Sequence, residues 1–249
     1  MEDVDLAVII LAAGKGTRMK SDLPKVLHQI ESKCLINYVL ECAEKIVGKN
    51  IHVVVGHQAE KVKSEIQKRF SVIFALQENM HGTGDAVKIG MKDVPKRIKN
   101  ILVLNGDVPF IKKSTLDTLI NAHKHNENMI TLLTVDLDKP TGYGRVVQDQ
   151  NGDVVCIKEE SDASFDERCI KKVNTGIYCF DRKFLEYAIP RIDSKNTQKE
   201  YYLTDVVAIA IKKKMKTGLI DVKDWREVVG INTLVDLKNA KELLKEIDL

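Results

Sequence analysis

Cations gather around a glycine-rich segment near the beginning of the chain. The segment contains two glycines and four basic residues, namely Gly14, Gly16, Lys15, Arg18, Lys20 and Lys25. Small residues leave backbone N–H groups accessible, and cations beside such groups suit a polyanion such as a phosphate chain. A solvated basic turn is the alternative, but such a turn does not require cations on a glycine-rich loop. The chemistry we expect here is therefore phosphate binding.

The segment does not match two common phosphate motifs. A dinucleotide fingerprint needs a third glycine where Met19 stands and an acidic residue near Cys34. The P-loop string G-x-x-x-x-G-K-[ST] does not occur. What remains is a small-residue loop that ends in Pro24 and Lys25, preceded by the apolar, β-branched run 8–11. That run predicts a strand buried on both faces.

Strand and helix patterns alternate as far as about residue 136. Further strands are expected at 51–56, 72–76 and 101–107, and helices at 35–46, 58–70 and 82–92. This alternation predicts a Rossmann-like α/β fold with a mostly parallel sheet and helices on both faces. Ligands of such sheets bind beyond the carboxyl ends of the strands. We therefore expect one cleft near Gly14, Gln77 and Asp107.

The second half is richer in β-structure. A hairpin is predicted around an Asn151-Gly152 turn, followed by a strand at 172–180. Helices are expected at about 203–214 and 234–247. The last helix either packs on the domain or links it to another part.

Composition excludes several classes of protein. The net charge of +3 is mild and the lysines of the chain are interleaved with acidic residues, so no nucleic-acid partner is expected. Five cysteines without a C-x-x-C pair indicate reduced thiols, a cytoplasmic location and no zinc site. Glu2 and Asp3 precede a short apolar run, which predicts neither a signal peptide nor a membrane partner. The histidines form no metal-ligand spacing and fit no Ser-His-Asp arrangement.

The string G-x-G-T-R-M-x(5)-P-K resembles the signature of sugar-nucleotide pyrophosphorylases. Residues 11–28 are similar to the uridyltransferase half of bifunctional bacterial N-acetylglucosamine-1-phosphate uridyltransferases. The resemblance implies a nucleotide-diphospho-sugar transferase fold with a small β-rich, sugar-binding part. It implies a nucleotidyltransferase domain at 1–232 and, at 233–249, a C-terminal helix for which a linker role is the alternative. It also implies no acetyltransferase β-helix and hence no acetyl transfer.

Two further strings extend the resemblance on the nucleotide side. LQENMHGTGDA (76–86) matches a uracil-binding pattern, which implies that Gln77, Gly82 and Thr83 bind the base and that Leu11, Ala12, Ala13 and Gly14 complete the nucleotide site. Thr83 and Asp85 could instead be ordinary helix-cap residues. LNGDVP (104–109) implies that Asp107 binds Mg²⁺, although Asp107 could also be a helix N-cap.

Strings from the second half resemble the sugar-binding side. They imply sugar contacts from Gly144, Glu159 and Asn174, with Asn105 and Gly106 beside them, and a second magnesium ligand in Asn232. Glu160 is adjacent to Glu159, so the choice between the two acids stays open. Asp85 and Asn105 depart from the residues usual in the family, a histidine and an aromatic residue respectively.

The reaction implied is transfer of UMP from UTP to N-acetylglucosamine 1-phosphate, giving UDP-N-acetylglucosamine, a precursor for cell-wall peptidoglycan. In it Arg18 and Lys25 would be catalytic and Mg²⁺ the cofactor. Alternatives are a nucleotidyltransferase for another sugar phosphate or another base, a glycosyltransferase, and a non-catalytic sugar-nucleotide sensor. The oligomeric state is left open, with a homo-oligomer among the alternatives.

Overall fold

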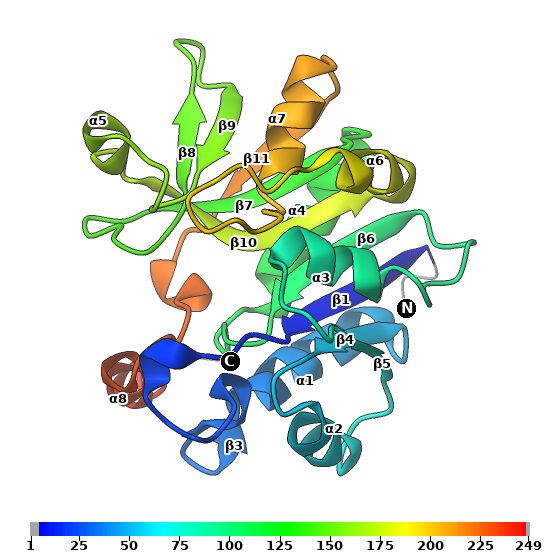
Figure 1. Ribbon diagram of the computed structural model, residues 1–249, viewed down its shortest axis with the longest axis vertical. Coiled ribbons are helices and arrows are strands. Elements are labelled where there is room, and N and C mark those ends of the chain that lie inside the picture. Colours follow the sequence, from blue (N-terminus) through cyan, green and yellow to red (C-terminus); the bar gives the residue numbers. More distant parts are fainter. Residues whose placement is uncertain (1–4, 248–249) are drawn as a thin grey trace.

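A mixed sheet runs through the centre of the molecule, with helices on both sides (Figure 1). The computed structural model describes residues 5–247, so Glu2 and Asp3 lie outside the described part. The main strand order is β11-β7-β10-β6-β1-β4-β5. The bounds are β1 Leu6–Ala12, β4 Ile51–Val55, β5 Ile73–Leu76, β6 Asn100–Asn105, β7 Ile130–Asp136, β10 Lys172–Asp181 and β11 Thr217–Asp221.

Most neighbouring strands run parallel, as the sequence predicts. β1 pairs in parallel with β4 and β6, β4 with β5, and β7 with β11. β10 is antiparallel to both β6 and β7, between which it lies. The predicted mostly parallel α/β sheet is therefore confirmed, with β10 running against its neighbours.

Both faces of β1 are buried. Val8 and Ile10 pack into one apolar cluster with α1 (Leu35–Val47), α2 (Ala59–Gln67) and α4 (Lys113–His125). Ala7 and Ile9 pack into a second cluster with α3 (Thr83–Gly90), α6 (Arg182–Ala188) and α7 (Asp205–Lys212). Successive residues of a strand point to opposite faces, so a strand between two helix layers is apolar throughout.

Four predicted helices are shorter in the structure, and one of them, expected at 82–92, is α3 at Thr83–Gly90. The helix expected at 58–70 is α2 at Ala59–Gln67, because Gln58 has a left-handed φ of 52°. The helix expected at 203–214 is α7 at Asp205–Lys212, and that expected at 234–247 is α8 at Leu234–Leu243. A capping box between Thr233 and Asp236 defines the start of α8.

The predicted hairpin is present as a branch of the same sheet, off its main strand order. β8 (Arg145–Gln148) pairs with β9 (Val154–Lys158), and Arg145 of β8 also pairs with Val173 of β10. Residues 149–153 connect the two strands, so the connection is longer than a two-residue Asn-Gly turn. Within it the N–H of Gly152 donates to the carbonyl of Asp149. Gly152 alone of the pair takes a left-handed φ, 85°. α5 (Phe165–Arg168) follows β9 in the chain, and α7 packs against β9 (Figure 1).

The C-terminal helix packs on the rest of the fold. Ala240 of α8 shares an apolar cluster with Ile30, Leu35 and Phe110. Ile30 belongs to a small ribbon of β2 (Gln29–Ile30) and β3 (Lys33–Cys34). Within residues 5–247, no helix has the length and apolar character needed to span a bilayer.

Candidate active site

A cavity of about 930 Å³ opens at the carboxyl ends of β1, β5 and β6. It is lined by residues that follow these strands and by residues of the second half of the chain. The predicted site residues that line it are Leu11, Ala12, Ala13, Gly14, Arg18, Lys25, Gln77, Gly82, Thr83, Asn105, Asp107, Gly144, Glu159, Asn174 and Asn232. One cleft therefore collects nearly all of them, as expected for an open parallel sheet.

Gly106 is the predicted site residue that does not line the cavity. Its amide donates to the carbonyl of Leu11. A Cβ at this position would lie 2.8 Å from Ile36 Cδ1 and 3.2 Å from Val26 Cγ1. Gly106 is thus needed for close packing between β6 and α1 and does not contact the cleft.

The glycine-rich loop brings Lys15, Arg18 and Lys25 to the cavity, whereas Lys20 does not line it. Gly16 has a left-handed φ of 61°, and a Cβ there would lie 2.7 Å from Lys25 Cβ. Short 3₁₀ turns at Thr17–Met19 and Lys25–Leu27 carry Arg18 and Lys25. A glycine is therefore required for the loop to close against Lys25.

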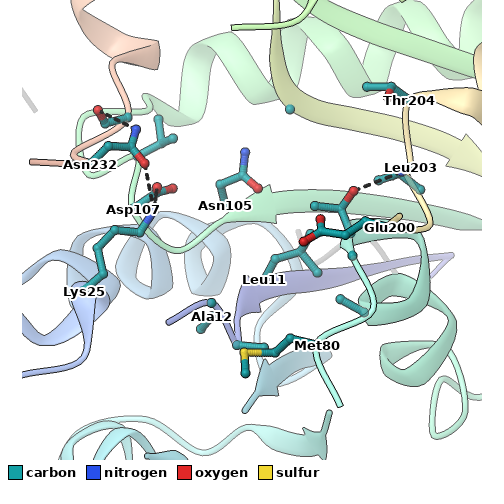
Figure 2. Close-up of a pocket in the computed structure, with 18 of the residues that line it drawn as sticks. Leu11, Ala12, Lys25, Met80, Asn105, Asp107, Glu200, Leu203, Thr204 and Asn232 are labelled. Atoms are coloured by element: carbon teal, nitrogen blue, oxygen red, sulfur yellow. Dashed lines mark hydrogen bonds and ion pairs between the residues drawn. The ribbon is translucent and has the colours of Figure 1, made fainter. Parts of the chain in front are cut away.

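Lys25 and Arg18 converge on two oxygen-bearing side chains. Lys25 Nζ forms an ion pair with Asp107 and lies 3.0 Å from Asn232 Oδ1 (Figure 2). Arg18 Nη2 donates to the same Asn232 oxygen at 2.8 Å. The Lys25 and Asp107 side chains are only 18% and 15% exposed, so their charges are partly shielded from water.

A backbone contact accounts for the meeting of Asp107 and Asn232. The amide of Ile231 donates to the carbonyl of Asp107 at 2.9 Å. Asp236 accepts from the amide of Asn232 at 2.9 Å, which ties Asn232 to the first turn of α8. Asp107 is not a helix cap, since the N-cap of α4 is Lys112.

Asp107 and Asn232 are suitable ligands for a hard cation. Asp107 Oδ2 and Asn232 Oδ1 both contact the ammonium of Lys25, so two oxygens already converge on one positive charge. Mg²⁺ prefers one or two carboxylates together with phosphate oxygens and water. No group of three or more His, Cys, Asp or Glu side chains that could form a cage occurs within residues 5–247.

The loop 79–84 is held against the segment 200–203. Gly84 N donates to the Tyr201 carbonyl at 2.8 Å, and Leu203 N donates to Thr83 Oγ1 at 3.0 Å (Figure 2). Gly82 has a φ of 108°, and a Cβ there would lie 2.6 Å from the backbone carbonyl oxygen of Tyr201. The side chain of Thr83 makes no cap at the start of α3. This loop is thus fixed in place before any ligand binds.

The second half of the chain supplies another wall of the cavity. The amide of Asn174 donates to the carbonyl of Gly144 at 2.9 Å. Asn174 Oδ1 accepts from the amide of Gly176 at 3.1 Å. Asn105 Nδ2 donates to the carbonyl of Thr175 at 3.3 Å. Figure 2 shows Asn105 between Asp107 and Glu200.

The structure distinguishes the two neighbouring acids. Glu159 lines the cavity, and its Oε1 accepts from Thr204 Oγ1 at 2.9 Å. Burial raises the pKa of Glu159, and the hydrogen bond from Thr204 partly opposes this effect. Glu160 instead forms an ion pair with Arg145, which is 2% exposed, at 2.7 Å. Glu159 is therefore the acid available to a ligand.

Some lining residues were not among those predicted for the site. They include Lys15, Tyr143, Thr204, Glu200 and His81. Lys15 falls within residues 11–28, Tyr143 within TGYGR (141–145), and Glu200 and Thr204 within EYYLTD (200–205). All of these strings belong to the resemblance, so their positions could have indicated these residues. His81 likewise falls within the string 76–86, although no histidine spacing pointed to it.

Comparison with known proteins gives the family. A model described as nucleotidyl transferase matches residues 7–242. The chain is 40% identical over 242 residues to the bifunctional protein GlmU of Clostridioides difficile (strain 630), covering 97% of the chain and 52% of that protein. It is 43% identical over 229 residues to that of Carboxydothermus hydrogenoformans, covering 92% and 50%. The chain thus spans about half the length of the curated relatives it matches.

A solved structure has the same fold. A Bacillus anthracis protein described as a candidate glucose-1-phosphate thymidylyltransferase, in complex with sucrose, superposes with a TM-score of 0.80. The alignment covers 98% of this chain and 97% of that protein at 19% identity. The match of the family model over most of the sequence agrees with this fold and with the cation-lined cleft. The chain therefore belongs to the nucleotidyl transferase family of enzymes.

Proposed function

We propose that this chain transfers UMP from UTP to N-acetylglucosamine 1-phosphate, releasing pyrophosphate and forming UDP-N-acetylglucosamine. The observation that carries the proposal is the cluster in which Lys25 contacts Asp107 and Asn232 while Arg18 reaches Asn232. A reaction between two anions needs such a concentration of positive charge. The motif resemblance supports the choice of uridine and of an amino sugar.

The reaction requires neither a covalent intermediate nor a general base. A phosphate oxygen of the sugar 1-phosphate attacks the α-phosphorus of UTP. The bond from that phosphorus to the bridging oxygen breaks, and its electron pair leaves with pyrophosphate. The attacking oxygen is already an anion, so the barrier comes from bringing anions together and from charge on the leaving group. Alignment and neutralisation therefore supply the catalysis.

Each charged residue has a distinct part in this scheme. Lys25 neutralises the α-phosphoryl group, and Arg18 stabilises the leaving phosphates. Asp107 and Asn232 would hold Mg²⁺, which when bound aligns and neutralises phosphate oxygens of both substrates. The shared position of these side chains at one end of the cavity supports this division.

The remaining lining residues bind the uncharged parts of the substrates. Gln77, with the backbone of Gly82 and Thr83, binds the base, and the small residues after β1 leave room for the nucleotide. A base suits these residues because a side-chain amide and backbone N–H groups can match the hydrogen-bonding edge of a pyrimidine. The sugar contacts are assigned to Gly144, Glu159, Asn174 and Asn105, which also line the cavity.

We also propose the domain division and the location. Residues 1–232 are assigned to the nucleotidyltransferase domain, and 233–249 to a C-terminal segment that contains α8. The packing of Ala240 with Ile30 and Phe110 supports a segment that docks on this domain. A cytoplasmic location is supported by the five cysteines, none of which forms a disulfide within residues 5–247.

A coupled pyrophosphate-release assay tests the proposal. UTP, dTTP, CTP and GTP are each combined with a panel of sugar 1-phosphates in the presence of Mg²⁺. The highest kcat/KM is expected for UTP with N-acetylglucosamine 1-phosphate. Preference for another pair would assign a different nucleotidyltransferase, and release of UDP from a UDP-sugar would indicate a glycosyltransferase. UTP binding without any turnover would indicate a sensor.

A further inference from the structure

The side-chain amide of Gln77 has a fixed orientation. Gln77 follows β5, is 3% exposed and lines the cavity. Its Nε2 donates to Asp85 Oδ2 at 2.9 Å and to the Gly82 carbonyl at 3.2 Å. Both N–H groups of this amide are therefore used within the protein.

The two partners determine which way the amide points. A carboxylate and a backbone carbonyl are both acceptors, so only the nitrogen of the amide can face them. The reverse orientation would place Gln77 Oε1 against two other oxygens, which is costly at a buried position. The atom that remains for a ligand is Oε1, an acceptor.

The backbone around this contact is also fixed. The amide of Gln77 donates to the carbonyl of Val55 at 2.8 Å, which anchors it beside β4. The Gly82 carbonyl also accepts from the amide of Ala86 in the first turn of α3. These bonds hold the backbone of Gln77 and the first turn of α3, which carries Asp85, in place beside each other.

From this contact we infer that Asp85 is a positioning residue that sets base selectivity, by making Gln77 present an acceptor to the base. Uracil and thymine carry an N–H at ring position 3, which can donate to Gln77 Oε1. Cytosine has an unprotonated N3, which would place a lone pair against that oxygen. The inference rests on the proposed function for the assignment of a nucleotide to this cavity.

The inference predicts how loss of the Asp85 carboxylate changes selectivity. In Asp85→Asn the new side chain can either accept or donate, so the Gln77 amide is free to reverse and pair with cytosine. Asp85→Ala removes one of the two acceptors altogether. We expect the wild type to favour UTP over CTP by on the order of 10²-fold and each variant to lower that ratio about tenfold.

Titration calorimetry in Mg²⁺ without sugar phosphate measures this selectivity independently of turnover. The ligands are UTP, CTP and 3-methyl-UTP, which lacks the N3 hydrogen. Asp93→Asn is the matched control, because it makes the same chemical change at an exposed acid near the end of α3. The control should keep the wild-type ratio, and a variant that merely misfolds should lose all three ligands together.

An unchanged UTP-to-CTP ratio in folded Asp85→Asn and Asp85→Ala would overturn the inference. If neither variant folds, the wild type decides: equal affinity for UTP and 3-methyl-UTP would overturn the inference, and a clear preference for UTP would support it. Pyrophosphate release by the wild type tests the proposed function separately. Selective UTP binding without turnover would reject that function and keep the role of Asp85.

Discussion

Lys25 and Asp107 form an ion pair although 82 positions separate them in the chain. Asp107 follows the central strand β6, and Lys25 belongs to the loop that follows its neighbour β1. The contact therefore joins the two strand ends on which the cleft is built. Because it is partly exposed, its own contribution to stability is small, about 1 kcal/mol or less.

Lys25→Ala should abolish most of the turnover and leave the fold intact. Removal of a charge that stabilises the transition state typically lowers kcat about 10²-fold or more. Lys33→Ala is a matched control, since Lys33 also forms a partly exposed ion pair, with Glu41, outside the cavity. Steady-state pyrophosphate release and circular dichroism would measure both effects. A Lys25→Ala enzyme with wild-type kcat would refute the catalytic role.

Gly82→Ala should raise KM for UTP as well as lower Tm. A Cβ on Gly82 would lie 2.6 Å from the backbone carbonyl oxygen of Tyr201, and the φ of 108° disfavours any side chain. Gly152→Ala is the control, because its φ of 85° imposes a similar backbone cost in the β8–β9 hairpin. Each change should cost about 1 kcal/mol or more, which lowers Tm by about 2–4 °C. Equal KM values for the two variants would argue against a nucleotide-binding loop at Gly82.

Glu159→Gln and Glu160→Gln should change stability in opposite directions at neutral pH. Burial raises the pKa of Glu159 in the folded state, so the folded protein holds this proton more tightly than the unfolded chain. Stability from this group is full below its unfolded pKa and is lost as pH rises through the folded pKa. Glu159→Gln should therefore increase the free energy of unfolding at pH 7, with little difference at low pH.

Glu160→Gln removes the charged partner of Arg145, which is buried. The expected loss is on the order of 1–3 kcal/mol, below that of a fully buried pair because Glu160 is 34% exposed. Urea unfolding at several pH values would measure both variants. The sugar-phosphate KM should rise only in Glu159→Gln, and a rise confined to Glu160→Gln would reverse the assignment of the two acids.

The sequence was informative where the signal is local. The apolar run 8–11, the small residues after it and the strand–helix alternation depend on neighbouring residues, and they predicted β1, its loop and the edge of the sheet that carries the cleft. The antiparallel direction of β10 could not be predicted, because an apolar strand pattern is the same in either direction. Helix ends also differed, since left-handed residues such as Gln58 are hard to foresee.

Contacts between distant segments were beyond sequence reasoning. The choice of Glu159 over Glu160 depends on Arg145, which pairs with only one of them. Gly106 was predicted to contact the sugar, but Ile36 and Val26 show that its lack of a side chain serves packing. The hydrogen bond between Asp85 and Gln77 likewise appears only once α3 is placed beside β5.

The most direct test is the rate of pyrophosphate release from UTP and N-acetylglucosamine 1-phosphate by Asp107→Asn over a range of Mg²⁺ concentrations. The account predicts a wild-type reaction that stops when EDTA removes the metal. It predicts a variant that is at least about 10²-fold slower at every Mg²⁺ concentration, because one of the two oxygen ligands has lost its charge. Asp117→Asn, which removes a surface partner of Lys113, is the control. An Asp107→Asn enzyme that reaches the wild-type rate would contradict the account.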